Sequence, residues 1–421
     1  MHHFQYREGV LHAEEHDLNA LAQRFGTPFY CYSAATLRRH VRVMREAFEG
    51  IDMLLAYAMK ANSNQAVLTL MAQEGAGADV VSLGELERAV AAGIPPERIV
   101  FSGVAKTEAE MRRALDLGIH CFNVESEPEL ARLDRVAGSM GRVAPVSVRI
   151  NPNVDARTHH KISTGKSENK FGIPFARALE VYAEIASMPH LKARGVDMHI
   201  GSQITDLEPF DNAFALLAEL VATLRGAGHD IAHVDVGGGL GIPYHKDNQA
   251  PPDPLAYARI VRKRVEGLGC KLVIEPGRLI AGNAGILVTR VEYVKQGADR
   301  TFIIVDAGMN DLIRPTLYNA HHDILPVAEA VPDGETVRAD VVGPVCETGD
   351  YIALARDMPA VREGDLLAVM TAGAYGAVMS STYNTRPLVA ELLVDGSHVH
   401  AIRPRQTLDA LIGLDSVPDW L

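Results

Sequence analysis

Eight short runs of apolar and β-branched residues alternate with segments of helical periodicity between about residue 36 and residue 280. When each strand is followed by a crossover helix, successive strands run parallel, and eight such units close into a (β/α)8 TIM barrel. The alternation therefore predicts an α/β fold built on such a barrel. The expected strands lie at residues 53–59, 78–81, 99–101, 119–124, 146–150, 195–200, 233–236 and 272–274, and the expected helices include residues 106–117 and 210–224.

The pattern changes past residue 283, where β-type runs are separated by turn signals without long helices between them. We expect three regions: a barrel over residues 35–282, a mostly antiparallel C-terminal β domain over 283–421, and an N-terminal segment, 1–34, that joins the β domain. The expected strands of the β domain lie at residues 288–294, 302–305, 337–342, 366–370 and 388–394, with residues 29–32 as the N-terminal contribution and a short helix at 406–412.

Composition narrows the class of partner. The 421 residues are 47% hydrophobic, which is enough for two buried cores. A formal net charge of -12 without a long Lys/Arg block argues against nucleic acid and against anionic membranes, and favours a small-molecule substrate. The N-terminus lacks the apolar core of a signal peptide, so a cytoplasmic protein is expected. The charge-free stretch 366–385 is interrupted by Gly, Ser, Thr and Asn and makes a poor membrane span.

The four cysteines, Cys31, Cys121, Cys270 and Cys346, are widely scattered. None has the paired spacing of a zinc site, and together they do not form a disulfide framework. We therefore expect no metal.

Polar residues and glycines follow the ends of most expected barrel strands. Barrel chemistry collects at the C-terminal ends of the strands, so we expect these residues to converge on one face. In chain order they are Lys60, Ser82 with Asp79 inside its strand, Arg149 with Asn151, His199 with Ser202, the run Gly237-Gly238-Gly239, and Glu275 to Arg278.

Lys60 and the glycine run suggest a cofactor. Lys60 stands where a buried strand meets solvent, and partial desolvation favours the neutral amine that traps carbonyl groups; the alternative is a lysine that ends a strand and reaches into water. The glycines can bring backbone N–H groups close to a phosphate, or can simply form a turn. Pyridoxal phosphate, a phosphorylated aldehyde, satisfies both requirements.

That cofactor needs an acidic partner for its ring nitrogen. Glu275, expected opposite Lys60 across the barrel mouth, suits this role, although it can equally cap a helix or form an ion pair. His199 can stack on the ring or be an ordinary core histidine.

Several motifs, in order along nearly the whole chain, resemble those of the diaminopimelate decarboxylases, which are alanine-racemase-like, fold-type III pyridoxal phosphate enzymes. They are YAMKAN at 57–62, HIGSQ at 199–203, the glycine run, EPGR at 275–278 and GPVCETGD at 343–350. The insert at 151–171, with ISTG at 162–165 and NKFG at 169–172, resembles this family in particular. Thr348 departs from the family's more usual serine but keeps a hydroxyl.

The resemblance implies roles for matching residues. Lys60 would hold the cofactor covalently, His199 would stack on its ring and Glu275 would pair with its nitrogen. The phosphate would be bound by Ser202, Gly239, the Gly277-Arg278 backbone and Tyr375. Gly238 and Pro276 would also belong to the cofactor-binding residues, and the supporting residues would be Asp79, Glu85 and Arg149. Substrate would be bound by Arg278, Arg314, Tyr318, Glu347 and Tyr375.

The resemblance also implies a reaction and an assembly. The reaction is decarboxylation of meso-2,6-diaminopimelate to L-lysine and carbon dioxide, the last step of lysine biosynthesis, with Cys346 as proton donor. Cys346 and Glu347 would enter the neighbouring subunit's site in a head-to-tail homodimer. Glu347 suits the distal ammonium of this substrate, while Arg278 and Arg314 suit its distal carboxylate. The alternatives are a related basic amino acid decarboxylase or racemase of the same fold, and a regulatory homologue that no longer binds the cofactor.

Overall fold

The computed structural model describes the chain except residues 1, 157, 159, 166–168, 246–251 and 332–333. Among the described residues there are two compact units. The barrel unit contains residues 38–243 and 249–280, and the β unit contains residues 1–37, 244–248 and 281–421. Part of the insert at 151–171 therefore lies outside the described residues.

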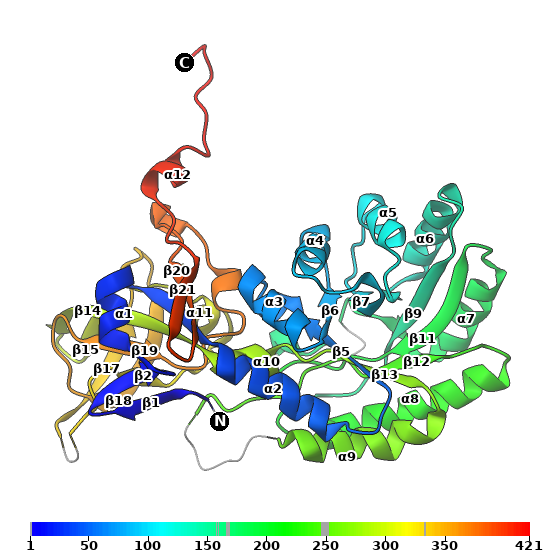
Figure 1. Cartoon of the computed structure of the whole chain (residues 1–421), viewed down its shortest axis with the longest axis horizontal. Helices are drawn as coiled ribbons and strands as arrows, with labels where there is room; N and C mark the ends of the chain where they lie inside the picture. The colour runs from blue at the N-terminus through cyan, green and yellow to red at the C-terminus, as the bar shows by residue number, and fades with distance from the viewer. Residues whose placement is uncertain (1, 157, 159, 166–168, 246–251, 332–333) are drawn as a thin grey trace. The chain divides into compact units, whose positions relative to one another are not determined.

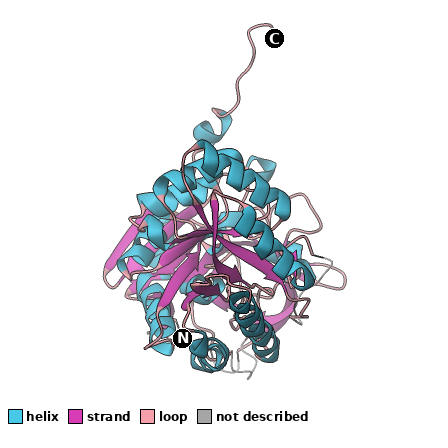
Figure 2. Cartoon of the chain, turned by 90° about the vertical axis from the view of Figure 1, so that its right-hand side faces the viewer, coloured by secondary structure: helices cyan, strands magenta, loops and turns pink. Residues whose placement is uncertain are grey.

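The barrel unit is a closed ring of eight parallel strands with helices outside it (Figures 1 and 2). This confirms the TIM barrel. Each strand pairs with the next, and β13 pairs with β5 to close the ring. The strands are β5 (Met53–Ala58), β6 (Gly77–Val80), β7 (Ile99–Phe101), β8 (Cys121–Val124), β9 (Ala144–Asn151), β11 (Leu191–Asp197), β12 (His233–Asp235) and β13 (Lys271–Ile274); a two-residue strand, β10 (Ile173–Pro174), adds to β9.

Local capping decides where the barrel helices begin. The helix expected from residue 106 starts at Glu108, because the side chains and backbones of Thr107 and Glu110 form a reciprocal capping box. Ser82 likewise accepts a hydrogen bond from the Glu85 N–H. The helices are α2 (Ala34–Ala47), α3 (Gln65–Gln73), α4 (Leu83–Ala91), α5 (Glu108–Leu117), α6 (Glu127–Ser139), α7 (Ala178–Ser187), α8 (Glu208–Gly226), α9 (Pro254–Val265) and α10 (Arg278–Ala281).

The main sheet of the β unit is mostly antiparallel, as expected. Its order is β18-β17-β15-β14-β4-β20-β21, with parallel pairing only for β15 with β17 and β4 with β20. The strands are β4 (Phe29–Ser33), β14 (Gly285–Gln296), β15 (Thr301–Val305), β17 (Thr336–Val342), β18 (Tyr351–Pro359), β20 (Ala390–Asp395) and β21 (His398–Arg403), with β16 (Ile324–Pro326) and β19 (Leu366–Val369) joined through β14.

Smaller elements complete this unit. A three-stranded sheet precedes helix α1, and a short helix ends at Ile412 as expected. They are β1 (Phe4–Arg7), β2 (Val10–Ala13), β3 (His16–Asp17), α1 (Leu18–Phe25), α11 (Arg314–Tyr318) and α12 (Leu408–Ile412). Among the helices described, none has both the length and the apolar character that crossing a bilayer requires.

Strand β4 is buried on both faces. Phe29 and Cys31 belong to one apolar cluster, and the alternating residues Tyr30 and Tyr32 belong to another. The tyrosine hydroxyls donate to the Asp311 carbonyl at 2.7 Å and to the Glu391 carboxylate at 2.6 Å. An N-terminal strand thus lies at the centre of a sheet otherwise made from the C-terminal part of the chain.

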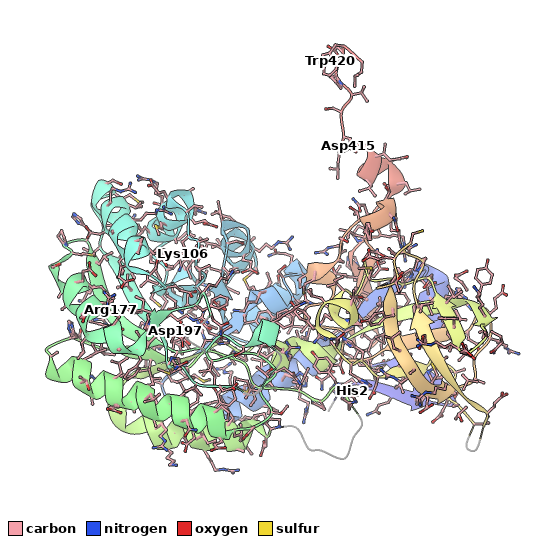
Figure 3. All side chains as sticks on the ribbon, turned by 180° about the vertical axis from the view of Figure 1, so that it is seen from behind. His2, Lys106, Arg177, Asp197, Asp415 and Trp420 are labelled. Carbon is pink, nitrogen blue, oxygen red and sulfur yellow. The ribbon has the colours of Figure 1, made fainter. Side chains whose placement is uncertain are left out.

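A buried ion pair braces the barrel unit. Lys106 (labelled in Figure 3) places Nζ 2.7 Å from Glu129 Oε1, and the two side chains are only 1% and 6% exposed. The same amine donates to the carbonyls of Gly103 and Asn123. Lys106→Met should destabilise the unit by about 3–5 kcal/mol, because the Glu129 carboxylate then remains buried without its cation.

The unfolding midpoint followed by circular dichroism measures this effect. The exposed pair Arg113–Glu87 is the control, since water screens it and Arg113→Met should move the midpoint little. Equal shifts for the two variants would contradict the importance of the buried pair.

Candidate active site

Lys60 lies on a short 3-10 turn, η1 (Met59–Ala61), directly after β5. Its Nζ is 2.9 Å from Asp79 Oδ2 in the neighbouring strand β6, where the register pairs Ala58 with Asp79. The lysine side chain is 40% exposed and the aspartate is fully buried. Asp79 Oδ1 has no hydrogen-bond partner among the described residues. The amine is therefore anchored by a buried carboxylate, while part of the lysine side chain is exposed.

Glu275 follows β13, the strand hydrogen-bonded to β5. The expectation that Glu275 lies opposite Lys60 across the mouth is thus wrong. Closing the ring makes the first and last strands neighbours, so the two residues follow adjacent strands.

A buried amide links the carboxylates inside the barrel. Asn123 Nδ2 donates to Asp235 Oδ2 and to Glu275 Oε1, each at 3.3 Å. Burial raises the pKa of Asp235 to about 6. Burial, followed by the charge of Asp235, raises the pKa of Glu275 well above its usual range. The pair therefore retains a proton more readily than two exposed carboxylates would.

Arg149 supplies positive charge to the same interior. Its Nη1 lies 3.2 Å from Glu125 Oε1, and its Nε lies 3.9 Å from Asp197 Oδ2 (Asp197 is labelled in Figure 3). Burial alone would lower the pKa of the guanidinium, but the surrounding carboxylates raise it. Arg149 thus remains charged and offsets part of the buried negative charge.

His199 is a neutral ring. Burial and then the positive charges of Arg149 and Lys60 lower its pKa well below the usual range. Its Nδ1 lies 3.2 Å from the Gly238 backbone nitrogen and accepts that N–H. The imidazole is consequently fixed against the glycine run, with Nδ1 as the acceptor.

The glycine run makes close approaches that a side chain would prevent. A Cβ on Gly238 would lie 2.2 Å from the Glu275 carbonyl oxygen, and one on Gly239 would lie 2.2 Å from the Gly201 carbonyl oxygen. Gly239 also has φ +100°, which favours glycine. Close packing alone therefore requires glycine at positions 238 and 239, independently of any phosphate that their backbone binds.

A hydroxyl and a guanidinium from two other loops are paired in the same unit. Ser202 Oγ accepts from Arg278 Nη2 at 3.0 Å. Gly277 fits closely against Ala58 and Ala61, and the Pro276 carbonyl accepts the Ala58 N–H at 3.3 Å. The EPGR segment is thereby fastened beside the turn that carries Lys60.

The other expected residues lie in the β unit. Arg314 is buried, with Nη1 2.8 Å from His322 Nε2 and its guanidinium 4.7 Å from the Tyr244 ring centroid. Tyr318 ends the same helix, α11. The structure therefore divides the predicted residues between the two units, and their meeting in one site belongs to the proposal below.

Cys346 and Glu347 are exposed on the loop between β17 and β18. Asp350 fastens this loop by accepting the N–H groups of Val345 and Met309, both at 2.6 Å. The Cys346 N–H donates to Asn384 Oδ1 at 3.3 Å. A firmly held loop thus presents a thiol and a carboxylate to solvent.

Several residues between positions 371 and 385 have strained backbone conformations. Thr371, Tyr375, Asn384 and Thr385 all have φ between 54° and 58°. Left-handed conformations of such residues cost free energy and are concentrated at functional sites. This supports a functional role for the segment that contains Tyr375.

Asn123, Asp197 and Asp235 are absent from the predicted set. They lie in strands at buried positions. A polar residue within an otherwise apolar strand is the signal that finds them, because a fully buried polar side chain needs a partner.

Asp235→Asn should weaken the pH dependence of stability. The pKa of Asp235 rises from 3.8 to about 6 on folding, so between these values the folded protein binds more protons than the unfolded chain. Stability therefore falls as pH rises through this window. The asparagine should remove up to about 3 kcal/mol of that fall, measured by thermal unfolding of parent and variant at about pH 4 and pH 7.

Asp211→Asn is the control of opposite sign. The hydrogen bond from Arg264 lowers the pKa of Asp211 to about 2, so this carboxylate contributes stability above its ordinary pKa that is lost as pH falls. An unchanged pH dependence in Asp235→Asn would contradict a raised pKa for Asp235.

Comparison with known proteins identifies the family of the chain. Residues 34–282 match the family described as pyridoxal-dependent decarboxylase, pyridoxal binding domain. The chain is 52% identical over 419 residues to the diaminopimelate decarboxylase of Vibrio cholerae, with 99% of both chains covered. It is 53% identical over 414 residues to that of Pseudomonas aeruginosa, covering 98% of this chain and 99% of the relative.

A solved structure gives the same result. The diaminopimelate decarboxylase of Helicobacter pylori complexed with L-lysine matches with a TM-score of 0.90 and 42% identity, covering 94% of this chain and 99% of that one. The identity extends over both units of the chain. The resemblance in the motifs is thus confirmed, and the chain belongs to the diaminopimelate decarboxylase family of pyridoxal-dependent decarboxylases.

Proposed function

We propose that this chain decarboxylates meso-2,6-diaminopimelate to L-lysine and carbon dioxide, with pyridoxal phosphate bound in the barrel unit. The observation that carries the proposal is the amine of Lys60 held by Asp79 beside the strand that leads to Glu275. This arrangement lies in a chain about half of whose residues are identical to those of diaminopimelate decarboxylases along its whole length. Bound pyridoxal phosphate would supply the electron sink for the carbanion left by carbon dioxide.

The barrel residues fit this cofactor. Lys60 offers an amine to an aldehyde, and the buried Asp79 holds that amine in position. Glu275 retains a proton because burial and neighbouring carboxylates raise its pKa, and it can share that proton with a ring nitrogen. The neutral ring of His199 can stack on another ring without bringing a buried charge.

A phosphate group fits the loops after β11, β12 and β13. The Ser202 hydroxyl and the Arg278 guanidinium are within hydrogen-bond distance of one another and can both donate to an anion. Gly239 and Gly277 would add backbone N–H groups, Gly238 would lie against the cofactor, and Tyr375 would complete the binding site. Pro276 would fix the course of this loop.

Substrate would be bound by residues of both units. Arg278, Arg314 and Tyr318 would bind carboxylate and polar groups, and Glu347 would bind the distal ammonium. Cys346 would return a proton to the carbon that loses carbon dioxide. The exposed position of Cys346 and Glu347 on a fastened loop supports their action in the neighbouring subunit of a homodimer.

Lys60→Ala tests the covalent role of the amine. The parent, purified without added cofactor, should have the visible absorbance of bound pyridoxal phosphate and release lysine from meso-diaminopimelate. The variant should lose that absorbance band and nearly all turnover, because capture of the aldehyde and exchange with substrate both need the amine. Lys271→Ala, at the opposite ends of the strands, is the matched control and should behave like the parent.

Turnover of Lys60→Ala within a few fold of the parent would contradict the assignment. A parent that binds the cofactor but acts faster on lysine or ornithine would instead overturn the choice of substrate.

Mixing inactive variants tests the shared site. Lys60→Ala and Cys346→Ala subunits, exchanged and reassembled, should regenerate about a quarter of the parent activity. Half of the dimers are then mixed, and one of the two sites in each has both groups. The control mixes Lys60→Ala with Glu275→Ala, which should stay inactive because both changes lie in the barrel unit and each site receives one of them. No recovery despite demonstrated exchange would mean that each chain builds its own site.

A further inference from the structure

Three side chains that bind metals well meet at the N-terminal ends of the barrel strands. His120 precedes β8, Cys121 begins β8 and His233 begins β12. Their ligand atoms all lie within 4.8 Å of one another. Lys60, His199 and Glu275 instead follow the C-terminal ends of their strands, so the cluster formed by His120, Cys121 and His233 lies toward the opposite ends of the strands.

The backbone makes room for this cluster. The His233 ring lies over Gly195 in β11, where a Cβ would come within 2.1 Å of His233 Nε2. The rings of His233 and His120 are 4.9 Å apart between centroids, at an interplanar angle of 51°. A glycine in the neighbouring strand thus lets two imidazoles from distant parts of the chain meet.

The cluster has unused binding capacity. The Nε2 atoms of His120 and His233 are both buried and have no hydrogen-bond partner among the described residues. Buried polar atoms are normally paired, so two nitrogens without partners, on rings whose centroids are 4.9 Å apart, need an explanation. An imidazole nitrogen of this kind can offer its lone pair to a metal ion.

We propose that His120, Cys121 and His233 bind a zinc-type divalent cation. Imidazole nitrogen and thiolate sulfur are the ligands that zinc prefers, and three protein ligands leave a fourth position for water. Ligand atoms around tetrahedral zinc lie about 3.3–3.6 Å apart, so the side chains need to close by roughly 1 Å.

The surroundings favour a cation. Cys121 Sγ donates to Asn123 Oδ1 at 3.5 Å, and Asn123 Nδ2 in turn donates to the buried carboxylate of Asp235 at 3.3 Å. A bound cation would be attracted by this carboxylate and would stabilise the Cys121 thiolate.

The sequence expectation of no metal considered only the local spacing of cysteines. The proposed ligands come from different strands: His120 and Cys121 are adjacent in the chain, and the barrel brings His233 to them from β12.

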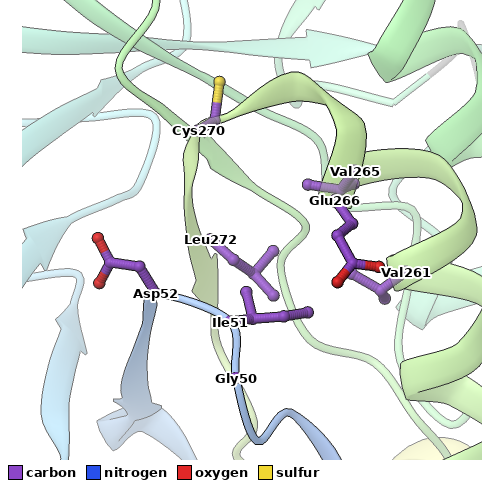
Figure 4. A pocket seen from close by; sticks show the side chains of 8 residues that line it. All are labelled: Gly50, Ile51, Asp52, Val261, Val265, Glu266, Cys270 and Leu272. Carbon is purple, nitrogen blue, oxygen red and sulfur yellow. The ribbon is translucent and has the colours of Figure 1, made fainter.

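Cys270 offers a matched control. It lines a different cavity of about 140 Å3 near the start of β13, with Leu272, Val261 and Val265 among its neighbours (Figure 4). Its sulfur accepts from Arg225 Nη2 at 3.0 Å, and neither of the cluster's histidines lines this cavity.

The test uses the full chain with its cofactor, depleted of metal by a chelator. Separate samples are titrated with Zn²⁺ and with Co²⁺. We expect one equivalent of either ion per chain and, with Co²⁺, a thiolate charge-transfer band and intense tetrahedral ligand-field bands. Cys121→Ser should weaken Zn²⁺ binding at least about tenfold and abolish the charge-transfer band, while Cys270→Ser should match the parent.

His120→Gln is a second variant, which removes one nitrogen ligand. If Cys121→Ser does not fold, the Zn²⁺ affinity of His120→Gln tests the proposal instead. Less than stoichiometric Zn²⁺, or equal affinity in the Cys121, His120 and Cys270 variants, would overturn the proposal. Zn²⁺ binding should also raise the thermal midpoint of the parent but not that of His120→Gln.

Discussion

The pairing of β13 with β5 is the contact on which the candidate site depends. Until these strands join at Leu55 and Ile274, the barrel is an open sheet and its two edges carry the ends that lead to Lys60 and Glu275. Closure brings these edges together and buries the polar residues of the interior. The candidate site therefore requires the complete ring. A substitution that weakens the pairing of β13 with β5 should disturb all the residues that follow the C-terminal ends of the barrel strands.

The barrel interior holds more negative than positive charge. Asp79, Asp197, Asp235 and Glu275 are all buried, and positive charge beside them comes from Arg149 and from the Lys60 amine. Such an interior is costly unless protons or cations compensate it. Burial raises the pKa of Asp197, Asp235 and Glu275, so these carboxyl groups retain protons more readily than exposed ones would.

Local patterns predict much of this molecule. The alternation of strands and helices and the polar residues at strand ends are visible over a few residues, which is why the barrel and Lys60 emerge from the sequence. The position of Glu275 relative to Lys60 cannot be predicted in this way, because the first and last strands become neighbours only when the ring closes. The hydrogen bonds from Asn123 in β8 to Asp235 in β12 and to Glu275 after β13 join residues far apart in the chain, so no short stretch of sequence predicts them.

Strands β18 and β21 escape prediction for a related reason. Strand β18 contains Arg356 and Asp357, and β21 contains the exposed His398 and His400, so neither reads as an apolar run. Pairing with the neighbours β17 and β20 decides their structure.

The position of strand β4 inside its sheet has a consequence for synthesis. Its earlier partner, β14, ends at Gln296, so on a ribosome adding about 5–20 residues per second β4 waits roughly 13–53 s for that partner, and longer for β20. During this time the large side chains of Phe29, Tyr30 and Tyr32 have no sheet to enter, while all the strands of the barrel unit have already been made. The nascent chain therefore carries an unpaired hydrophobic strand ahead of a finished domain, which is the kind of segment that chaperones bind.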